Sequence, residues 1–318
     1  MWDVLRRRML MAIPLMLGVV VLSFVLIQLA PGSFFEVMTS DQQVSDAATL
    51  ERLRALYGAD IPAWKQLLGY IASVARLDFG FSYRQNMPVL QIILDRLPAT
   101  LLLMLTSLGI ATLVGIAAGT IAAVKVGTIW DTLISVLVVI CFAAPSFWAG
   151  IMLIVLFSVK LGWLPVGGIR TVGADESGVL DVLRHLILPA LTLGLFYAAI
   201  YARLMRASML EVSQLDYVRT ARAKGLGAAR VVIAHIFRNA LLPVVTLFGL
   251  QLGTVLGGSV VVESVFGWPG IGTLLFDSVS SRNYPVVLGV MVFSAGVVVI
   301  ANILVDLAYF KLDPRTRR

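Results

Sequence analysis

The stretch that decides the architecture is ATLLLMLTSLGIATLVGIAAGTIAAV, residues 99–124. It carries no charged side chain and exceeds the about 20 mostly apolar residues that cross a bilayer as a helix. The whole chain shares this character, since 59% of its 318 residues are hydrophobic, only 14% are charged and the mean hydropathy is +0.94. Soluble domains have roughly 45–50% apolar and 25% charged residues. The sequence therefore predicts an integral membrane protein.

Six segments have the length and apolar character of membrane spans, at about 9–30, 99–124, 132–158, 186–205, 240–262 and 285–308. The first is predicted to be retained, because its apolar run is longer than the roughly 7–15 residues of a cleaved signal core. We expect an all-α integral membrane fold with six transmembrane helices in a single domain over 1–318. The core of that domain covers about 95–308.

Orientation follows from the placement of positive charge. Most of the 25 Lys and Arg residues fall in inner segments if the N-terminus is cytoplasmic, and inner loops normally carry that excess. Both termini and residues 206–239 are thus expected in the cytoplasm, and the segment 31–98 outside. The basic pI of about 9.8 then reflects topology, so no nucleic-acid partner is expected.

The sequence contains no recognisable catalytic or metal-binding motif. His185 and His235 have no second ligand three or four residues further along the chain, and Cys141 lies alone in an apolar run. No phosphate-binding loop, zinc-protease helix or nucleophile elbow occurs. We expect no catalytic residue, no metal site and no enzymatic activity. Few ionisable side chains cross the centres of the spans, which argues against an ion-driven carrier.

Glycines recur at helical spacing where helices approach closely. Gly115 and Gly119 form one pair, and Gly249, Gly253 and Gly257 extend the pattern along the fifth span. Small residues let helix backbones touch in lipid. Two interpretations stay open: packing within this fold, or an interface with a second subunit.

A basic strip, DYVRTARAKGLGAARVVIAHIFRNALLPV, follows the fourth span at residues 216–244. Its pattern predicts a helix over 210–222, a turn at Gly225 and Gly227, a second helix over 228–239 and a fifth span opened by Pro243. A side chain at Gly225 is expected to block the turn. Arginines favour either anionic membrane lipid or a protein partner. The projecting turn and nearby alanines, including Ala221, favour a protein.

This strip resembles the loop that marks membrane subunits of bacterial ATP-binding-cassette importers, most closely the dipeptide, oligopeptide and nickel permeases. Aligning Gly225 puts Arg219, Thr220 and Ala221 at the family's E-A-A positions, of which only the last alanine matches. Further similar segments are 77–103, 161–168, 263–289 and the tail DPRTRR. The resemblance covers nearly the whole chain.

The resemblance implies a type I importer transmembrane domain in the bacterial inner membrane. It implies a second homologous permease, two ATPase subunits that hold ATP and Mg, and an extracytoplasmic binding protein that delivers peptides. Nickel, glutathione or another small solute is the alternative cargo, and a stand-alone channel or carrier is the rival function. The residues implied in ATPase docking are Asp216, Tyr217, Arg219, Ala221, Arg222, Gly225, Leu226 and Arg230.

The segment 263–284, ESVFGWPGIGTLLFDSVSSRNY, is too short and interrupted to cross a bilayer. Its Pro-Gly turn and short apolar stretch suggest a piece that dips back near the outer mouth. We expect an external gate built from Phe266, Trp268, Pro269 and Gly270.

Overall fold

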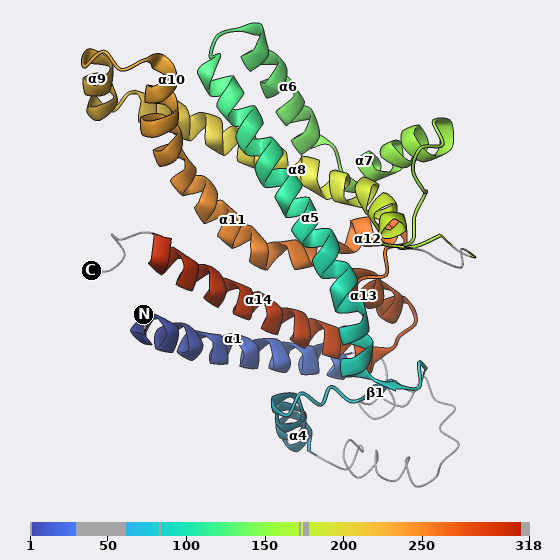
Figure 1. Cartoon of the computed structure of the whole chain (residues 1–318). Helices are drawn as coiled ribbons and strands as arrows, with labels where there is room; N and C mark the ends of the chain where they lie inside the picture. Colours follow the sequence, from blue (N-terminus) through green and yellow to red (C-terminus); the bar gives the residue numbers. More distant parts are fainter. Residues whose placement is uncertain (1, 30–61, 83, 172, 174–177, 313–318) are drawn as a thin grey trace. The chain divides into compact units, whose positions relative to one another are not determined.

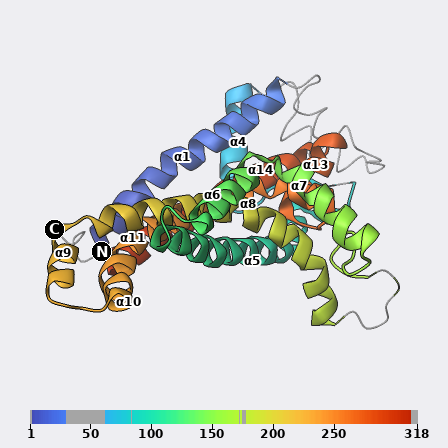
Figure 2. The ribbon, with the colours of Figure 1, turned by 90° about the horizontal axis from the view of Figure 1, so that it is seen from above.

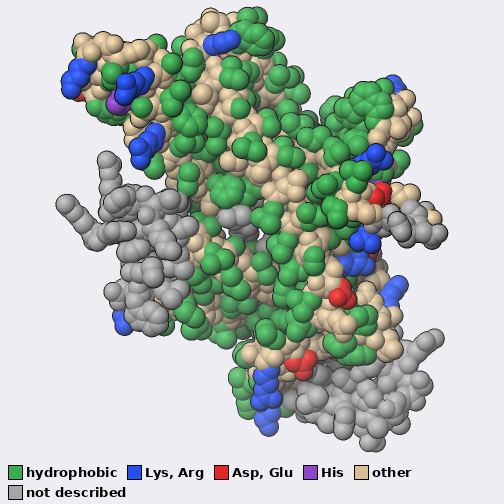
Figure 3. Space-filling model, in the orientation of Figure 1, with side chains coloured by type: hydrophobic (Ala, Val, Ile, Leu, Met, Phe, Trp, Pro, Cys, Tyr) green, Lys and Arg blue, Asp and Glu red, His purple; other side chains and the backbone are tan. Residues whose placement is uncertain are grey.

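The computed structural model describes residues 2–29, 62–82, 84–171, 173 and 178–312, and these residues are mostly helical. Five helices are long and apolar enough to cross a membrane: Met9–Leu26, Val89–Val124, Val179–Ser213, Ala228–Gln251 and Tyr284–Val305. Two bent helix pairs raise the number to as many as seven. Hydrophobic side chains cover much of the outer surface (Figure 3). The predicted all-α integral membrane fold is thereby confirmed.

The chain divides into two compact units. The first comprises Met1–Thr100 and Pro269–Arg318, and the second comprises Leu101–Trp268. Residues 31–61 and 83 of the predicted outer segment 31–98 lie outside the described residues, which resume at Pro62.

The first unit contains α1 (Trp2–Gln28), α4 (Ala63–Ala75), β1 (Phe81–Ser82), β2 (Met87–Pro88), the first turns of α5 (Val89–Val124), α13 (Ile271–Ser280) and α14 (Tyr284–Leu312). The helices α1 and α14 pack side by side and run in opposite directions (Figure 1). The two short strands form an antiparallel hairpin, with Phe81 opposite Pro88 and Ser82 opposite Met87. The buried Nδ2 of Asn283 donates to Ser82 Oγ at 2.8 Å and fastens this hairpin to the start of α14.

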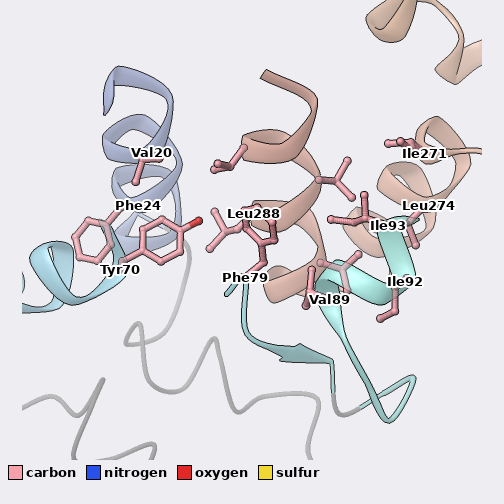
Figure 4. Close-up of a cluster of buried hydrophobic side chains, with 13 residues drawn as sticks. Val20, Phe24, Tyr70, Phe79, Val89, Ile92, Ile93, Ile271, Leu274 and Leu288 are labelled. Carbon is pink, nitrogen blue, oxygen red and sulfur yellow. The ribbon is translucent and has the colours of Figure 1, made fainter. Parts of the chain in front are cut away.

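The core of the first unit is a cluster of buried apolar side chains from five helices and the loop that holds Phe79 (Figure 4). Its members include Val20, Phe24, Tyr70, Phe79, Val89, Ile92, Ile93, Ile271, Leu274 and Leu288. Gly289 allows α14 to approach closely, because a Cβ at that position would lie 2.4 Å from Val89 Cγ1. The inner faces of α1 and α14 therefore meet protein, while the apolar outer faces are left for lipid.

The second unit contains the rest of α5, α6 (Ile129–Ala143), α7 (Ser146–Leu153), the π-helix η1 (Ile154–Lys160), α8 (Val179–Ser213), α9 (Asp216–Ala223), α10 (Ala228–Val231), the π-helix η2 (Val232–Phe237), α11 (Arg238–Gly258) and α12 (Val260–Phe266). The long helix α8 is central to this unit, since it contacts α6, α7, α11 and α12. The short helices α9 and α10 lie at one end of α8 and α7 lies at the other (Figures 1 and 2).

Two glycines bring α5 directly against α8. A Cβ at Gly115 would lie 2.4 Å from Tyr201 Cβ, and one at Gly119 would lie 2.5 Å from the Ala202 carbonyl oxygen. This pair therefore serves packing within the chain. Gly249 is buried in α11, whereas the surroundings of Gly253 and Gly257 lie outside the described side chains. An interface role for these three glycines remains a prediction.

The segment expected as one span over 132–158 is bent by 106° between α6 and α7. Pro145 causes this break, because proline donates no backbone hydrogen bond and pushes the preceding residue out of helical conformation. Ala144 accordingly has φ −71° and ψ 128°. The helices α12 and α13 have seven and ten residues, so neither is long enough to cross a bilayer alone.

Candidate functional site

The basic strip begins with a helix break that the sequence pattern did not predict. The expected helix over 210–222 is wrong, because α8 ends at Ser213 and α9 begins at Asp216. The amides of Gln214 and Leu215 turn back to the carbonyls of Glu211 and Val212 and close α8. Leu215 is extended, with φ −70° and ψ 147°. A chain reversal therefore separates α9 from the spanning helix.

Gly225 ends α9 as the pattern predicted, although for a different reason. Its amide donates to the Arg222 carbonyl at 3.0 Å, and the Leu226 amide donates to the Ala221 carbonyl at 3.4 Å. These two bonds form a Schellman motif, which needs a left-handed residue, and Gly225 has φ +77°. A Cβ there would meet nothing within 4 Å. Steric blocking of the turn within this chain is thus the wrong explanation, and backbone conformation is the requirement.

The second arm of the strip continues into a spanning helix without a break. The elements α10, η2 and α11 follow one another from Ala228 to Gly258, and Pro243 lies inside α11 rather than at the start of a span. The expected helix end at 239 is therefore wrong. The wider turn of the π-helix η2 explains why helical projection from the sequence is unreliable here.

Most of the predicted docking residues are exposed on one end of the second unit. We call the exposed side chains Asp216, Arg219, Arg222, Lys224 and Arg230, together with Gly225, the α9 surface. Figure 3 shows Lys and Arg side chains gathered over this end. Leu226 is half-buried. Ala221 is only 5% exposed and packs inward with the fully buried Val218, so its small side chain serves the loop's own packing rather than contact with a partner.

An exposed ion pair on the α9 surface is weak. Arg219 Nη1 lies 3.7 Å from Asp216 Oδ1, and the two side chains are 72% and 98% exposed. Exposed pairs of this kind contribute roughly 0–1 kcal/mol. Exchanging the Asp216 carboxylate for an acidic group on a partner therefore costs Arg219 little.

Tyr217 has a different environment from the rest of the predicted docking residues. Its hydroxyl donates to the backbone carbonyl of His235 in η2 at 3.2 Å. Asn239 Nδ2 donates to the Tyr217 oxygen at 3.0 Å and to the His235 carbonyl at 2.7 Å. We call these three groups the tyrosine clasp. It joins α9 to the first turn of α11.

The structure also contains an ion pair that sequence reasoning missed. Arg206 Nε donates to Asp131 Oδ1 at 2.7 Å and Arg206 Nη2 donates to Asp131 Oδ2 at 2.9 Å. The Gly127 amide donates to Asp131 Oδ2 at 3.1 Å. This two-pronged geometry gives both energy and orientation. It fastens the start of α6 to the part of α8 that leads into α9, but no local sequence signal links residues so far apart.

The expected gate residues are packed inside rather than arranged around an opening. Phe266 and Trp268 are 2% and 0% exposed. The Phe266 carbonyl accepts a bond from the Gly168 amide at 2.7 Å, and its ring faces Gly150 within the second unit. In the first unit, Gly270 follows Pro269 and is the N-cap residue of α13. A gate at these residues therefore stays a prediction and requires movement of α12.

A buried acid next to the gate segment was also missed. Glu263 in α12 is 0% exposed and its Oε1 accepts a hydrogen bond from Ser259 Oγ at 3.1 Å. Among the residues that the structure describes, no three His, Cys, Asp or Glu side chains lie close enough to hold a metal ion.

Comparison with known proteins gives matches over almost the whole chain. Residues 115–318 match the family described as binding-protein-dependent transport system inner membrane component, and residues 1–104 match the N-terminal model of such membrane components. The chain is 43% identical to the di/tripeptide transport system permease protein DppB of Pseudomonas aeruginosa, covering 100% of this chain and 99% of that protein. It is 43% identical to the oligopeptide transport system permease protein AppB of Bacillus subtilis, covering 97% of each.

A solved structure shares the fold at low sequence identity. The crystal structure of an amino acid ABC transporter with histidines matches with a TM-score of 0.53 and 16% identity, covering 70% of this chain and 94% of that one. The resemblance inferred from the basic strip and its flanking motifs is confirmed by these matches.

Proposed function

Since the chain belongs to the family of binding-protein-dependent transport system inner membrane components, a family of multi-pass proteins of the bacterial inner membrane, we propose that it forms one half of a peptide pathway. A second homologous permease supplies the other half. Two separate ATPase subunits drive the pair, and an extracytoplasmic binding protein delivers the cargo.

The α9 surface is the observation that carries this proposal. An eight-residue helix with exposed arginines is held away from α8 by the break at Gln214 and Leu215. Arg219, Arg222 and Arg230 present guanidinium groups that suit carboxylates and carbonyls on a partner. We therefore assign the α9 surface to ATPase docking.

The mechanism is alternating access without covalent chemistry in this chain. ATP and Mg reside on the ATPase subunits, and closure of those subunits displaces α9. The chain itself converts that displacement into movement of α8 and α11, which contact each other along the second unit. A ligand shifts such an equilibrium only by its differential affinity for the two states. Cargo enters from the binding protein in one state and leaves toward the cytoplasm in the other.

Peptide cargo is the inference from relatives, because DppB of Pseudomonas aeruginosa is a di/tripeptide permease and AppB of Bacillus subtilis an oligopeptide permease. Glutathione, itself a short peptide, and nickel are the alternatives. The delivering protein is expected to select among them.

The test is gentle purification of the tagged chain from its native membrane, followed by identification of the proteins that remain bound. An ATPase and a second permease are expected. Gly225→Pro should abolish ATPase retention, because proline is confined to φ near −65°. Gly227→Ala is the matched control, since Gly227 has φ −57° and a Cβ there meets nothing within 4 Å.

Uptake of labelled dipeptides, glutathione and nickel into vesicles that contain the purified assembly and its binding protein then identifies the cargo. A chain that purifies alone and transports without an ATPase would establish the rival stand-alone carrier.

A further inference from the structure

We propose that Tyr217 is a positioning residue that transmits movement of α9 to α11, and not a residue that contacts the ATPase. This inference rests on the proposed function of the α9 surface. It assigns to the tyrosine clasp a mechanical route out of α9 in addition to the chain connections to α8 and, through the Gly225 turn, to α10.

The clasp is complete in hydrogen-bonding terms. A tyrosine hydroxyl has one proton to donate, and here it goes to the His235 carbonyl, while its oxygen accepts from Asn239. The Asn239 amide has two protons, one directed at the Tyr217 oxygen and the other at the His235 carbonyl. The polar end of Tyr217 is thus directed back at this chain, although 41% of the residue remains exposed.

The rest of α9 lacks such directional contacts with α11. Its buried face consists of Val218 and Ala221, and apolar burial is non-directional. Both ends of this helix are chain reversals, at Gln214 and Leu215 and at Gly225. A helix held in this way can turn about its apolar contact when a partner pushes it. The clasp resists that turning because the two hydrogen bonds of the Tyr217 hydroxyl, one to η2 and one to α11, favour one orientation of α9.

The groups that bond the Tyr217 hydroxyl lie at the base of a candidate spanning helix. The His235 carbonyl belongs to the π-helix η2 and Asn239 lies in the first turn of α11. These elements form part of the continuous apolar segment Ala228–Gln251. A displacement imposed at Asn239 is therefore applied directly to the base of a candidate spanning helix. Single π-turns occur frequently at functional sites, and this one places the carbonyl within reach of both side chains.

The experiment compares Tyr217→Phe, which removes the hydroxyl and keeps the ring, with Asn239→Ala and with the double variant. Thr132→Val is the control, because Thr132 lies in the first turn of α6 and donates its hydroxyl to the backbone carbonyl of Thr128, not to a residue of α9 or α11. Each assembly is purified, its retained ATPase is quantified, and peptide uptake is measured per ATP hydrolysed in vesicles.

We expect both single variants to retain the ATPase but to lower uptake per ATP by about fivefold, which corresponds to the net worth of about one hydrogen bond. The double variant should lose no more than either single one, because all three changes open the same clasp. Thr132→Val should match the unaltered chain. Hydrogen exchange of the α9 amides should quicken in the clasp variants alone, which separates loss of orientation from a folding defect.

Two results overturn the inference. Loss of ATPase retention in Tyr217→Phe would return Tyr217 to the docking surface, and unchanged uptake per ATP in both single variants would leave the clasp without a mechanical role. Failure of the unaltered chain to retain any ATPase is a different outcome, since it removes the proposed function on which the inference rests.

Discussion

The close approach of α5 to α8 gives a prediction with a control in the same helix. Gly119→Ala places a methyl group 2.5 Å from the Ala202 carbonyl oxygen and 2.7 Å from Met205 Cβ. Backbone atoms cannot rotate away, so the two helices must separate along this seam. Overpacking of this kind costs about 1–3 kcal/mol. Gly109→Ala, two to three turns earlier in α5, meets nothing within 4 Å.

Both substitutions gain helix propensity, by up to about 1 kcal/mol, so that gain cancels when the two variants are compared. Gly109→Ala should be as stable as the unaltered chain or slightly more stable. Gly119→Ala should be less stable than Gly109→Ala by about 1–3 kcal/mol, the overpacking cost alone.

Cys141 provides the assay. It is the single cysteine of the chain, it is half-buried, and it lines an apolar cleft with Ala198, Ala199 and Ala202 of α8. A thiol-reactive dye in mild detergent should label it as the seam between α5 and α8 opens on heating. Gly119→Ala should be labelled at a lower temperature than Gly109→Ala, by several degrees. Equal midpoints, or a higher midpoint for Gly119→Ala, would refute the close packing of α5 on α8.

Three further predictions concern single contacts. Gly225→Ala should weaken ATPase retention by about 5- to 30-fold, because a left-handed conformation costs an alanine about 1–2 kcal/mol. Gly225→Asn should weaken retention less, since asparagine tolerates that conformation. Titration of the ATPase against the immobilised permease measures both effects. Asp131→Asn should lower the midpoint of thermal unfolding, because it leaves Arg206 without its two-pronged acceptor. Asp216→Asn removes only an exposed pair and should leave the midpoint unchanged. Equal midpoints for the two variants would show that the pair of Asp131 and Arg206 does not stabilise the fold. Asn283→Ala should expose the β1–β2 hairpin to protease by deleting its buried bond to Ser82, at a cost of about 1–3 kcal/mol; cleavage at the same rate as in the unaltered chain would contradict this.

Features encoded by local composition were predictable from the sequence. The uncharged run over 99–124 lies within α5, and the turn at Gly225 lies where glycine interrupts a helix-forming segment. In both cases a few neighbouring residues determine the conformation. The bend after Ala144 was visible in the sequence as Pro145, but proline within an apolar segment is also tolerated in an unbroken helix. Pro243 shows that second outcome inside α11.

Features that depend on distant partners could not be predicted in the same way. Asp131 and Arg206 are separated by 75 positions, and Tyr217 and Asn239 by 22. Nothing beside these residues indicates what they contact. From the sequence, Tyr217 has the pattern of an exposed aromatic residue in a loop. The carbonyl that it contacts belongs to His235 in the π-helix η2, and this π-helix has no simple sequence signal. Ala221 illustrates the reverse error, since a small residue on a short helix suits close contact with a partner and inward packing equally well.

The contacts around α8 indicate how a force on the α9 surface would be divided. Under the proposed function, the output of the α9 surface is its displacement. A displacement of one helix moves its neighbour through contacts that oppose movement in that direction. Apolar packing is non-directional, so it opposes sliding of one helix along another poorly. Toward α6, α8 is fastened by the two-pronged pair of Asp131 and Arg206, and toward α5 by the glycine seam at Gly115 and Gly119. Movement of α8 should therefore carry both of these helices with it, whereas α11 receives the motion of α9 through the Gly225 turn and the two exposed hydrogen bonds of Tyr217. Opening the clasp should then impair transport only in part. Opening the link between Asp131 and Arg206 should impair it more, even though Tyr217 lies closer to the proposed docking surface.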